Sequence, residues 1–191
     1  MEVDWEFEVG PDAAGLAAPV IDALWPGFVD LHRAPELAGH LPETAQLPAL
    51  AGALAKLNAA ASPVWTSKCD FWPRLEADEL DAGELDAPPG CITHAMGCYI
   101  DLLPRDGQGW VRPDIAEAVC KRVCGLLRAV PLGCCRADLV IRRAFITADR
   151  MDLGITVYLT SCGSSSAEAE WTLAAALTAL TDAFGSHSTV E

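Results

Sequence analysis

Alternating apolar and polar residues mark several segments of the chain as β-strands. Between positions 3 and 9 every second side chain is apolar and the intervening residues are acidic, a pattern typical of a strand with one buried face. Similar patterns predict further strands at residues 64–72, 92–103, 137–146 and 153–161. The polar residues that join the last two segments predict a hairpin.

Other segments carry apolar residues every three or four positions, which is the period of an amphipathic helix. They span residues 47–60, 113–128 and 167–184. Pro113 suits the first turn of the second helix, where its missing N–H is not needed. The third helix follows a run of serines, one of which we expect to supply the N-cap oxygen.

Two long segments lack either period. Residues 11–48 are interrupted by repeated prolines, so we expect short helical turns and loops there. Residues 73–90 form an acidic segment bounded by prolines, which predicts a long loop. The last residues, 186–191, are expected to be a frayed tail.

The order of these elements predicts a single α+β domain over residues 1–185. Its first six elements follow the β-α-β-β-α-β order of ferredoxin-like folds, and an extra strand and a C-terminal helix come after them. We expect a mainly antiparallel sheet of about five strands with the helices packed on one face. The alternative is a meander of the last four strands, also with helices on one face.

Composition narrows the range of partners. The chain has 191 residues, of which 51% are hydrophobic, so it can bury a sizeable core. It carries 27 acidic and 13 basic residues, and its net charge of -14 argues against nucleic acid and anionic membranes as partners. The first ten residues have neither the basic nor the apolar region of a signal peptide. We therefore expect an acidic cytoplasmic protein.

The eight cysteines are expected to be reduced thiols in that compartment. Cys91, His94 and Cys98 have the spacing Cys-x2-His-x3-Cys, which raises the question of a metal site. In a strand, Cys91 and His94 point to opposite faces, and His94 and Cys98 lie roughly 13 Å apart. Zinc needs its ligands about 2.0–2.3 Å from its centre, so we predict no metal site and no cofactor.

The remaining cysteines have two interpretations. Cys120 and Cys124 lie one helical turn apart beside an apolar stripe and are expected to be small packing residues. Cys162 precedes a helix N-terminus, which can lower a thiol pKa. It is therefore the best single candidate for a reactive cysteine.

A polar sheet face is the stronger indication of a binding site. If the helices cover one face, the strand alternation brings polar side chains of both charge signs to the other. The candidate ligand-binding residues on this face are Thr66, Lys68, Asp70, Tyr99, Asp101, Arg142 and Tyr158. Lys68 is notable because the chain has three lysines against ten arginines. The simpler interpretation is that the face is polar because it meets water.

These features support three hypotheses. The first is a non-catalytic protein that uses the polar face to bind a small polar ligand or to form a homodimer. The second is an enzyme acting on a small polar metabolite, with Asp70, Asp101 or His94 as the acid/base group. There Lys68 or Arg142 would hold an anionic group. The third is a thiol or metal protein. Because common catalytic motifs are missing, the sequence leaves open whether the protein is an enzyme.

The divergent geometry of Cys91, His94 and Cys98 generates a first prediction. Purified protein should contain no stoichiometric metal, and chelator should leave its unfolding temperature unchanged. Elemental analysis checks this expectation directly, and one equivalent of zinc or iron per chain would contradict it.

Overall fold

The fold is described from a computed structural model covering residues 1–8, 23–24, 26–76, 80–105, 110, 112–147 and 150–185. Its elements, in chain order, are β1 (Glu2–Glu8), η2 (Pro35–His40), α1 (Pro42–Gln46), α2 (Pro48–Asn58), β2 (Val64–Trp72), β3 (His94–Pro104), α3 (Pro113–Arg128), β4 (Cys135–Thr147), β5 (Arg150–Gly163) and α4 (Ser166–Gly185). The predicted tail at residues 186–191 lies outside the described residues.

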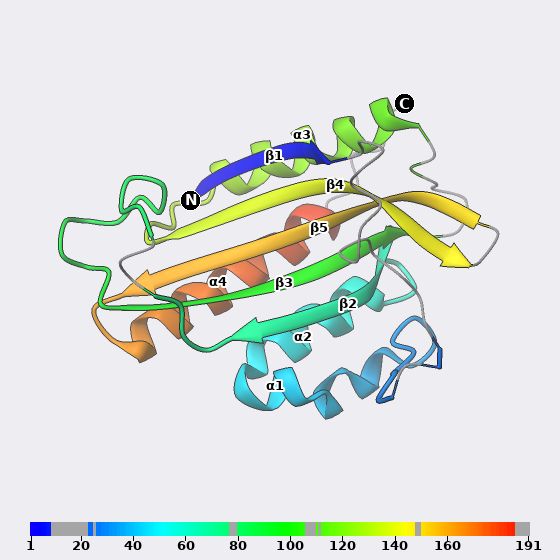
Figure 1. Ribbon diagram of the computed structural model, residues 1–191, viewed down its shortest axis with the longest axis horizontal. Coiled ribbons are helices and arrows are strands. Elements are labelled where there is room, and N and C mark those ends of the chain that lie inside the picture. The colour runs from blue at the N-terminus through cyan, green and yellow to red at the C-terminus, as the bar shows by residue number, and fades with distance from the viewer. Residues whose placement is uncertain are drawn as a thin grey trace.

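The strands form one five-stranded sheet in the order β1-β4-β5-β3-β2 (Figure 1). β1 pairs with β4 in parallel, and the other neighbouring pairs are antiparallel. The sheet is therefore mixed, which corrects the expectation of a mainly antiparallel sheet. The α+β class is confirmed, but the ferredoxin-like comparison is not. Alternation predicts which residues are strands, whereas the pairing of β1 with β4 depends on contacts more than a hundred residues apart in the chain.

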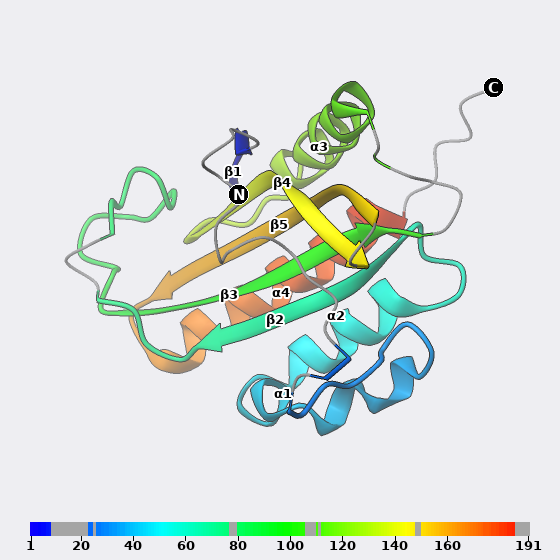
Figure 2. The same cartoon turned by 45° about the vertical axis from the view of Figure 1, so that its right-hand side comes forward.

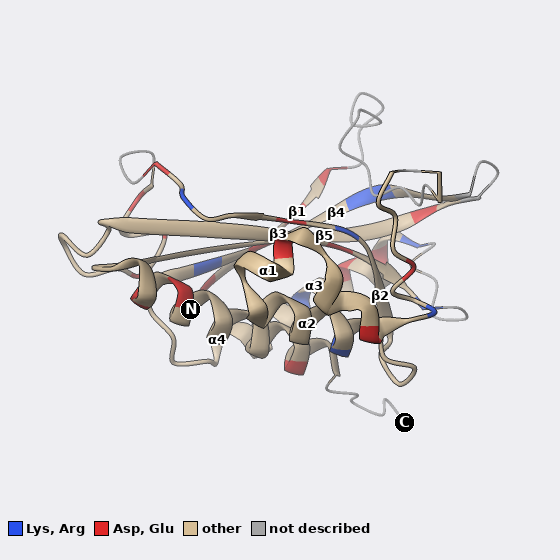
Figure 3. Cartoon of the chain, turned by 90° about the horizontal axis from the view of Figure 1, so that it is seen from below, with Lys and Arg blue, Asp and Glu red and all other residues tan. Residues whose placement is uncertain are grey.

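The helices of the described residues all lie on the same side of the sheet. Figure 3 shows the sheet edge-on with the helices beneath it, and Figure 2 shows α3, α4 and α2 side by side behind the strands. α4 packs on β5 and β3 and contacts both α2 and α3. No helix in the described part of the chain is long and apolar enough to cross a bilayer.

The core lies between the sheet and this helical layer. On β5, Ile155, Val157 and Leu159 point toward the helices and are at most 1% exposed. Leu173 and Leu177 of α4 are buried to the same extent. α4 begins as its sequence predicts, because Ser165 Oγ accepts a hydrogen bond from the Glu168 backbone N–H.

The two segments without a clear period differ in the structure. The proline-interrupted segment contains the short helices η2 and α1, and both begin at a proline. In the acidic segment, the described residues 73–76 and 80–90 form a loop, which includes Leu85; residues 77–79 lie outside the described residues. Leu85 is 2% exposed and packs with Ala95 of β3 and Cys162 of β5. The loop therefore covers one end of the sheet on the face opposite the helices.

The helical cysteines generate a second prediction. Cys120 and Cys124 of α3 are at most 1% exposed and belong to the main core. Cys120→Ala and Cys124→Ala should each lower the free energy of unfolding by about 1 kcal/mol, measured by chemical denaturation. The half-buried Cys91 of the loop is the matched control, and Cys91→Ala should change stability less. Equal effects at all three positions would contradict the packing role.

Candidate functional site on the open sheet face

The open sheet face is the side of the sheet opposite the helices. The strand register places Asp70, Tyr99, Tyr158 and Asp138 in adjacent positions across four strands of this face. Asp101 lies opposite Thr156 in the next row of the same face. The structure thus brings together all but one of the predicted ligand-binding residues.

Aromatic rings form a continuous row across the open sheet face. The ring centroids of Trp72 and Tyr99 are 5.7 Å apart, and those of Tyr99 and Tyr158 are 6.0 Å apart. The Arg142 guanidinium lies 5.6 Å from the Tyr158 ring centroid. Such spacings favour ring–ring and cation–π attraction. The row, from Trp72 to Arg142, offers flat π-faces beside charged groups.

Arg142 is held in place at the end of this row. Its Nη1 donates to the Tyr158 hydroxyl at 2.9 Å, and its Nε donates to Glu8 Oε2 at 2.6 Å. Only 15% of its side chain is exposed. A guanidinium with hydrogen-bond partners on two sides is held in one orientation, so Arg142 has little freedom to rearrange around a ligand.

Asp101 is a buried carboxylate beside the row. It is 3% exposed, and Thr156 Oγ1 donates a hydrogen bond of 2.6 Å to its Oδ1. Burial raises the pKa of Asp101 to about 6, although the Thr156 hydrogen bond and the charges of Lys68 and Arg142 act in the opposite direction. Burial and the neighbouring carboxylates raise the pKa of Tyr99 to about 12, so its hydroxyl remains protonated.

Lys68 is the exposed cation of the site. Its side chain is exposed, and its ammonium lowers the pKa of Asp101 through space. Both residues lie in the described part of the chain, and no direct ion pair joins them. Lys68 therefore leaves its ammonium within electrostatic reach of the Asp101 carboxylate without contacting it.

Thr66 is the predicted residue that does not join the site. The pairing of β2 with β3 shifts by one residue between Thr66 and Cys69, which is a β-bulge. Thr66 consequently faces the helices, where its Oγ1 accepts a 2.7 Å hydrogen bond from Asn58 Nδ2. Lys68 lies within this shift, on the open sheet face, where its charge acts on Asp101. Strict alternation placed Thr66 and Lys68 on one face because it contains no signal for the extra residue.

Trp72 is a site residue that the sequence analysis missed. It lies two positions after Asp70, beyond the bulge, and alternation therefore places both on the same face. Gly97 lies opposite Trp72 on β3, and a Cβ there would lie 3.4 Å from Trp72 Cε3. The closest neighbours of such a Cβ would be the Leu159 carbonyl oxygen at 3.1 Å and Leu75 Cδ1 at 3.2 Å. The available signal for Trp72 was the alternation that puts it on the same face as Asp70.

A depression of about 260 Å³ adjoins the row over β1 and β4. Asp4, Glu6, Asp138 and Tyr158 are among the residues that line it. Arg136 neutralises Asp138 through a 2.8 Å hydrogen bond and also binds Glu84. Acidic groups therefore outnumber unengaged cations on this side of the row.

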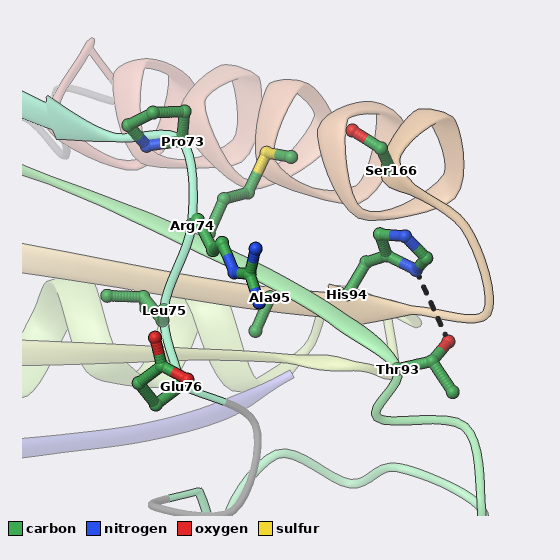
Figure 4. Close-up of a pocket in the computed structure, with 9 residues that line it drawn as sticks. Pro73, Arg74, Leu75, Glu76, Thr93, His94, Ala95 and Ser166 are labelled. Carbon is green, nitrogen blue, oxygen red and sulfur yellow. Dashed lines mark hydrogen bonds between the residues drawn. The ribbon is translucent and has the colours of Figure 1, made fainter.

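A larger cavity of about 440 Å³ lies at the far end of β3, near the start of α4. Figure 4 shows Arg74, Glu76 and His94 around it, with His94 Nδ1 3.4 Å from Thr93 Oγ1. His94 is exposed there and shares the helix-facing side of β3 with Cys98. It is thus separate from Asp70 and Asp101, the two other acid/base candidates.

The cysteine motif does not form a joint site. Cys98 is sealed in the main core, whereas His94 is exposed and Cys91 precedes β3. Within the described ranges no three His, Cys, Asp or Glu side chains group closely enough to hold a metal ion. The expectation for Cys162 is wrong in direction, because burial and neighbouring thiols raise its pKa to about 12. Burial outweighs the helix terminus here.

Comparison with known proteins found no relative. No protein-family model, curated protein or solved structure matches the chain.

The buried carboxylate generates a third prediction. Between its ordinary pKa of 3.8 and its folded value of about 6, Asp101 holds a proton in the folded state that the unfolded chain has released. The free energy that Asp101 contributes to folding therefore falls as pH rises through this window. Asp101→Asn keeps the Thr156 partner without the charge. Its stability relative to wild type should increase by up to about 3 kcal/mol between pH 4 and pH 7.

Denaturation curves of the two proteins across this pH range provide the measurement. Other titrating groups are common to both chains and cancel in the difference. Parallel stability profiles would show that Asp101 ionises in the folded protein as it does in water.

Proposed function

We propose that the protein is a non-catalytic binding protein that holds a small zwitterionic ligand on the open sheet face. The observation that carries this proposal is the arrangement of Lys68 and Asp101. Their opposite charges lie near each other without direct contact, beside a row of aromatic rings. A molecule with an amine and a carboxylate can satisfy both charges at once.

The surroundings support such a ligand over a singly charged one. Asp101 is buried, so an ammonium that reaches it interacts through a medium of lower dielectric than water. Lys68 is exposed and free to swing onto a ligand carboxylate. Tyr99 and Trp72 offer half-exposed ring faces on which an apolar or aromatic group can rest. The net acidity of the face disfavours ligands that carry only negative charge.

A fourth prediction uses three matched probes: phenylalanine, phenethylamine and 3-phenylpropionate. They share a ring and chain but carry both charges, the amine alone or the carboxylate alone. Isothermal titration should give the order phenylalanine, then phenethylamine, then 3-phenylpropionate. Lys68→Met keeps the aliphatic stem but removes the charge. This variant should weaken phenylalanine binding about tenfold, which corresponds to a loss of about 1.4 kcal/mol of binding free energy. It should leave phenethylamine binding unchanged.

Lys56→Met is the matched control, because Lys56 is an exposed lysine of α2 on the helical side. It should bind all three probes as the wild type does. Equal effects of the two lysine variants, or a carboxylate probe that binds best, would overturn the proposed role of Lys68.

Self-assembly through the same face is the other form of the proposal. Half-exposed rings on an uncovered sheet face are typical of subunit contacts as well as of ligand sites. Sedimentation velocity on the wild type and on Lys68→Met separates the two forms. A homodimer that Lys68→Met dissociates would favour assembly, and a monomer that binds the probe would favour the ligand.

An acid/base enzyme is the alternative function, and the raised pKa of Asp101 favours it. A carboxyl group with a pKa of about 6 exchanges its proton close to neutral pH, as a general acid or base must. Lys68 or Arg142 would then hold an anionic part of the substrate. Chemical conversion of a bound probe, lost in Asp101→Asn, would select this alternative.

A further inference from the structure

Cys134 and Cys162 lie opposite each other where β4 begins and β5 ends. In the antiparallel ladder Cys135 pairs with Ser161, so the preceding residue of β4 faces the following residue of β5. The Cys162 backbone N–H donates to the Cys134 carbonyl oxygen at 2.9 Å, which continues this register. Opposed residues of such a ladder have Cα atoms about 4.5–5.5 Å apart, within the 4.4–6.8 Å range of disulfide-bonded cysteines.

The two residues also share one packing cluster. Cys134 packs against the small group of buried residues formed by Leu85, Ala95 and Cys162. Cys162 is completely buried beneath the loop that contains Leu85, while Cys134 is only partly buried. One thiol is therefore partly accessible to reagents, and the other is sealed at the opposite position of the ladder.

The backbone at this position is held in an unusual conformation. Cys134 has a φ of 57°, and Asp86, to which it is joined, has a φ of 49°. Among the described residues other than glycine, these two have a positive φ. The Cys134 N–H donates to the Asp86 carbonyl oxygen at 3.3 Å. Left-handed backbone is unfavourable for side chains other than glycine, asparagine and aspartate. This conformation is held by backbone hydrogen bonds on both sides, since the Cys134 carbonyl also accepts from the Cys162 N–H.

We propose that Cys134 and Cys162 form a dithiol site that exchanges with low-molecular-weight disulfides and closes to an intramolecular disulfide. Cys134 is the attacking thiol because it is only partly buried. Cys162 is the resolving thiol because it is sealed from the solvent and lies opposite Cys134 in the ladder. The site is separate from the proposed ligand site, and neither proposal depends on the other.

The exchange balances in two steps. The Cys134 thiol loses its proton and attacks a disulfide RSSR, forming a Cys134–SR bond and releasing RS⁻, which takes up that proton. The Cys162 thiol then loses its proton and attacks the Cys134 sulfur. The Cys134–SR bond breaks, the second RS⁻ leaves and is protonated, and the protein disulfide forms. The protein thiols are oxidised and RSSR is reduced to two RSH.

The other cysteines of the described chain provide the contrast. Cys98, Cys120 and Cys124 are sealed between the sheet and the helices, so reagents do not reach them in the folded protein. Cys135 follows Cys134 directly but faces the core. Cys91 is the one alternative partner, since its charge influences both members of the pair.

The test incubates the folded, reduced protein with oxidised glutathione, followed by alkylation of the remaining thiols and peptide mass spectrometry. The wild type should form a Cys134–Cys162 disulfide and lose two titratable thiols without retaining glutathione. Cys162→Ala should accumulate a stable glutathione adduct on Cys134. Cys134→Ala should form neither the disulfide nor the adduct at this site. Cys120→Ala, the matched control, should behave as the wild type.

The pH dependence adds a second readout. Burial raises the pKa of the Cys134 thiol, so the reactive thiolate is a minor species near neutral pH. The rate of adduct formation in Cys162→Ala should therefore rise about tenfold per pH unit from pH 7 to pH 8. Persistent glutathione on wild-type Cys134, a disulfide to Cys91, or free Cys134 and Cys162 after the incubation would each overturn the proposal.

Discussion

The strict alternation of β5 at the centre of the sheet is the constraint on which the rest of the structure depends. β5 pairs with β4 on one side and β3 on the other, so neither of its edges is free. Ile155 and Val157 on one side require an apolar cover, which the helical layer provides. Thr156 and Tyr158 must then point away from the helices. The polar face is thus a consequence of placing a two-faced strand between two partners, before any ligand is considered.

That arrangement explains why a charged group is buried on the face without a helix over it. Asp101 lies opposite Thr156 on the neighbouring strand and receives its hydroxyl hydrogen bond. One hydrogen bond and two more distant cations do not replace full hydration, so the carboxyl holds its proton more tightly than in water. Replacement by a neutral residue would relieve this penalty. A buried carboxyl with a raised pKa is for this reason a candidate functional group.

Sequence reasoning succeeds where an element depends on neighbouring residues in the chain and fails where it depends on distant ones. β2 and α3 were predicted with their observed bounds, Val64–Trp72 and Pro113–Arg128, because alternation, helical period and a first-turn proline are local signals. Among the predicted ligand-binding residues, Thr66 lies elsewhere because the bulge turns it toward Asn58, and Trp72 was not predicted at all. The parallel pairing of β1 and the approach of Cys134 to Cys162 depend on register between distant segments. Neither leaves a mark on periodicity.

The same register argument connects the two proposed sites. Cys162 and Tyr158 are separated by four residues of β5, so both side chains leave the strand on the open sheet face. At the Tyr158 end, the face is occupied by rings and charges that meet the solvent. At the Cys162 end, the loop carrying Leu85 closes over it and leaves only Cys134 partly accessible. The sheet face opposite the helices therefore carries both proposed sites, one at its open end and one beneath the loop. The cover over each end determines which chemistry is available there.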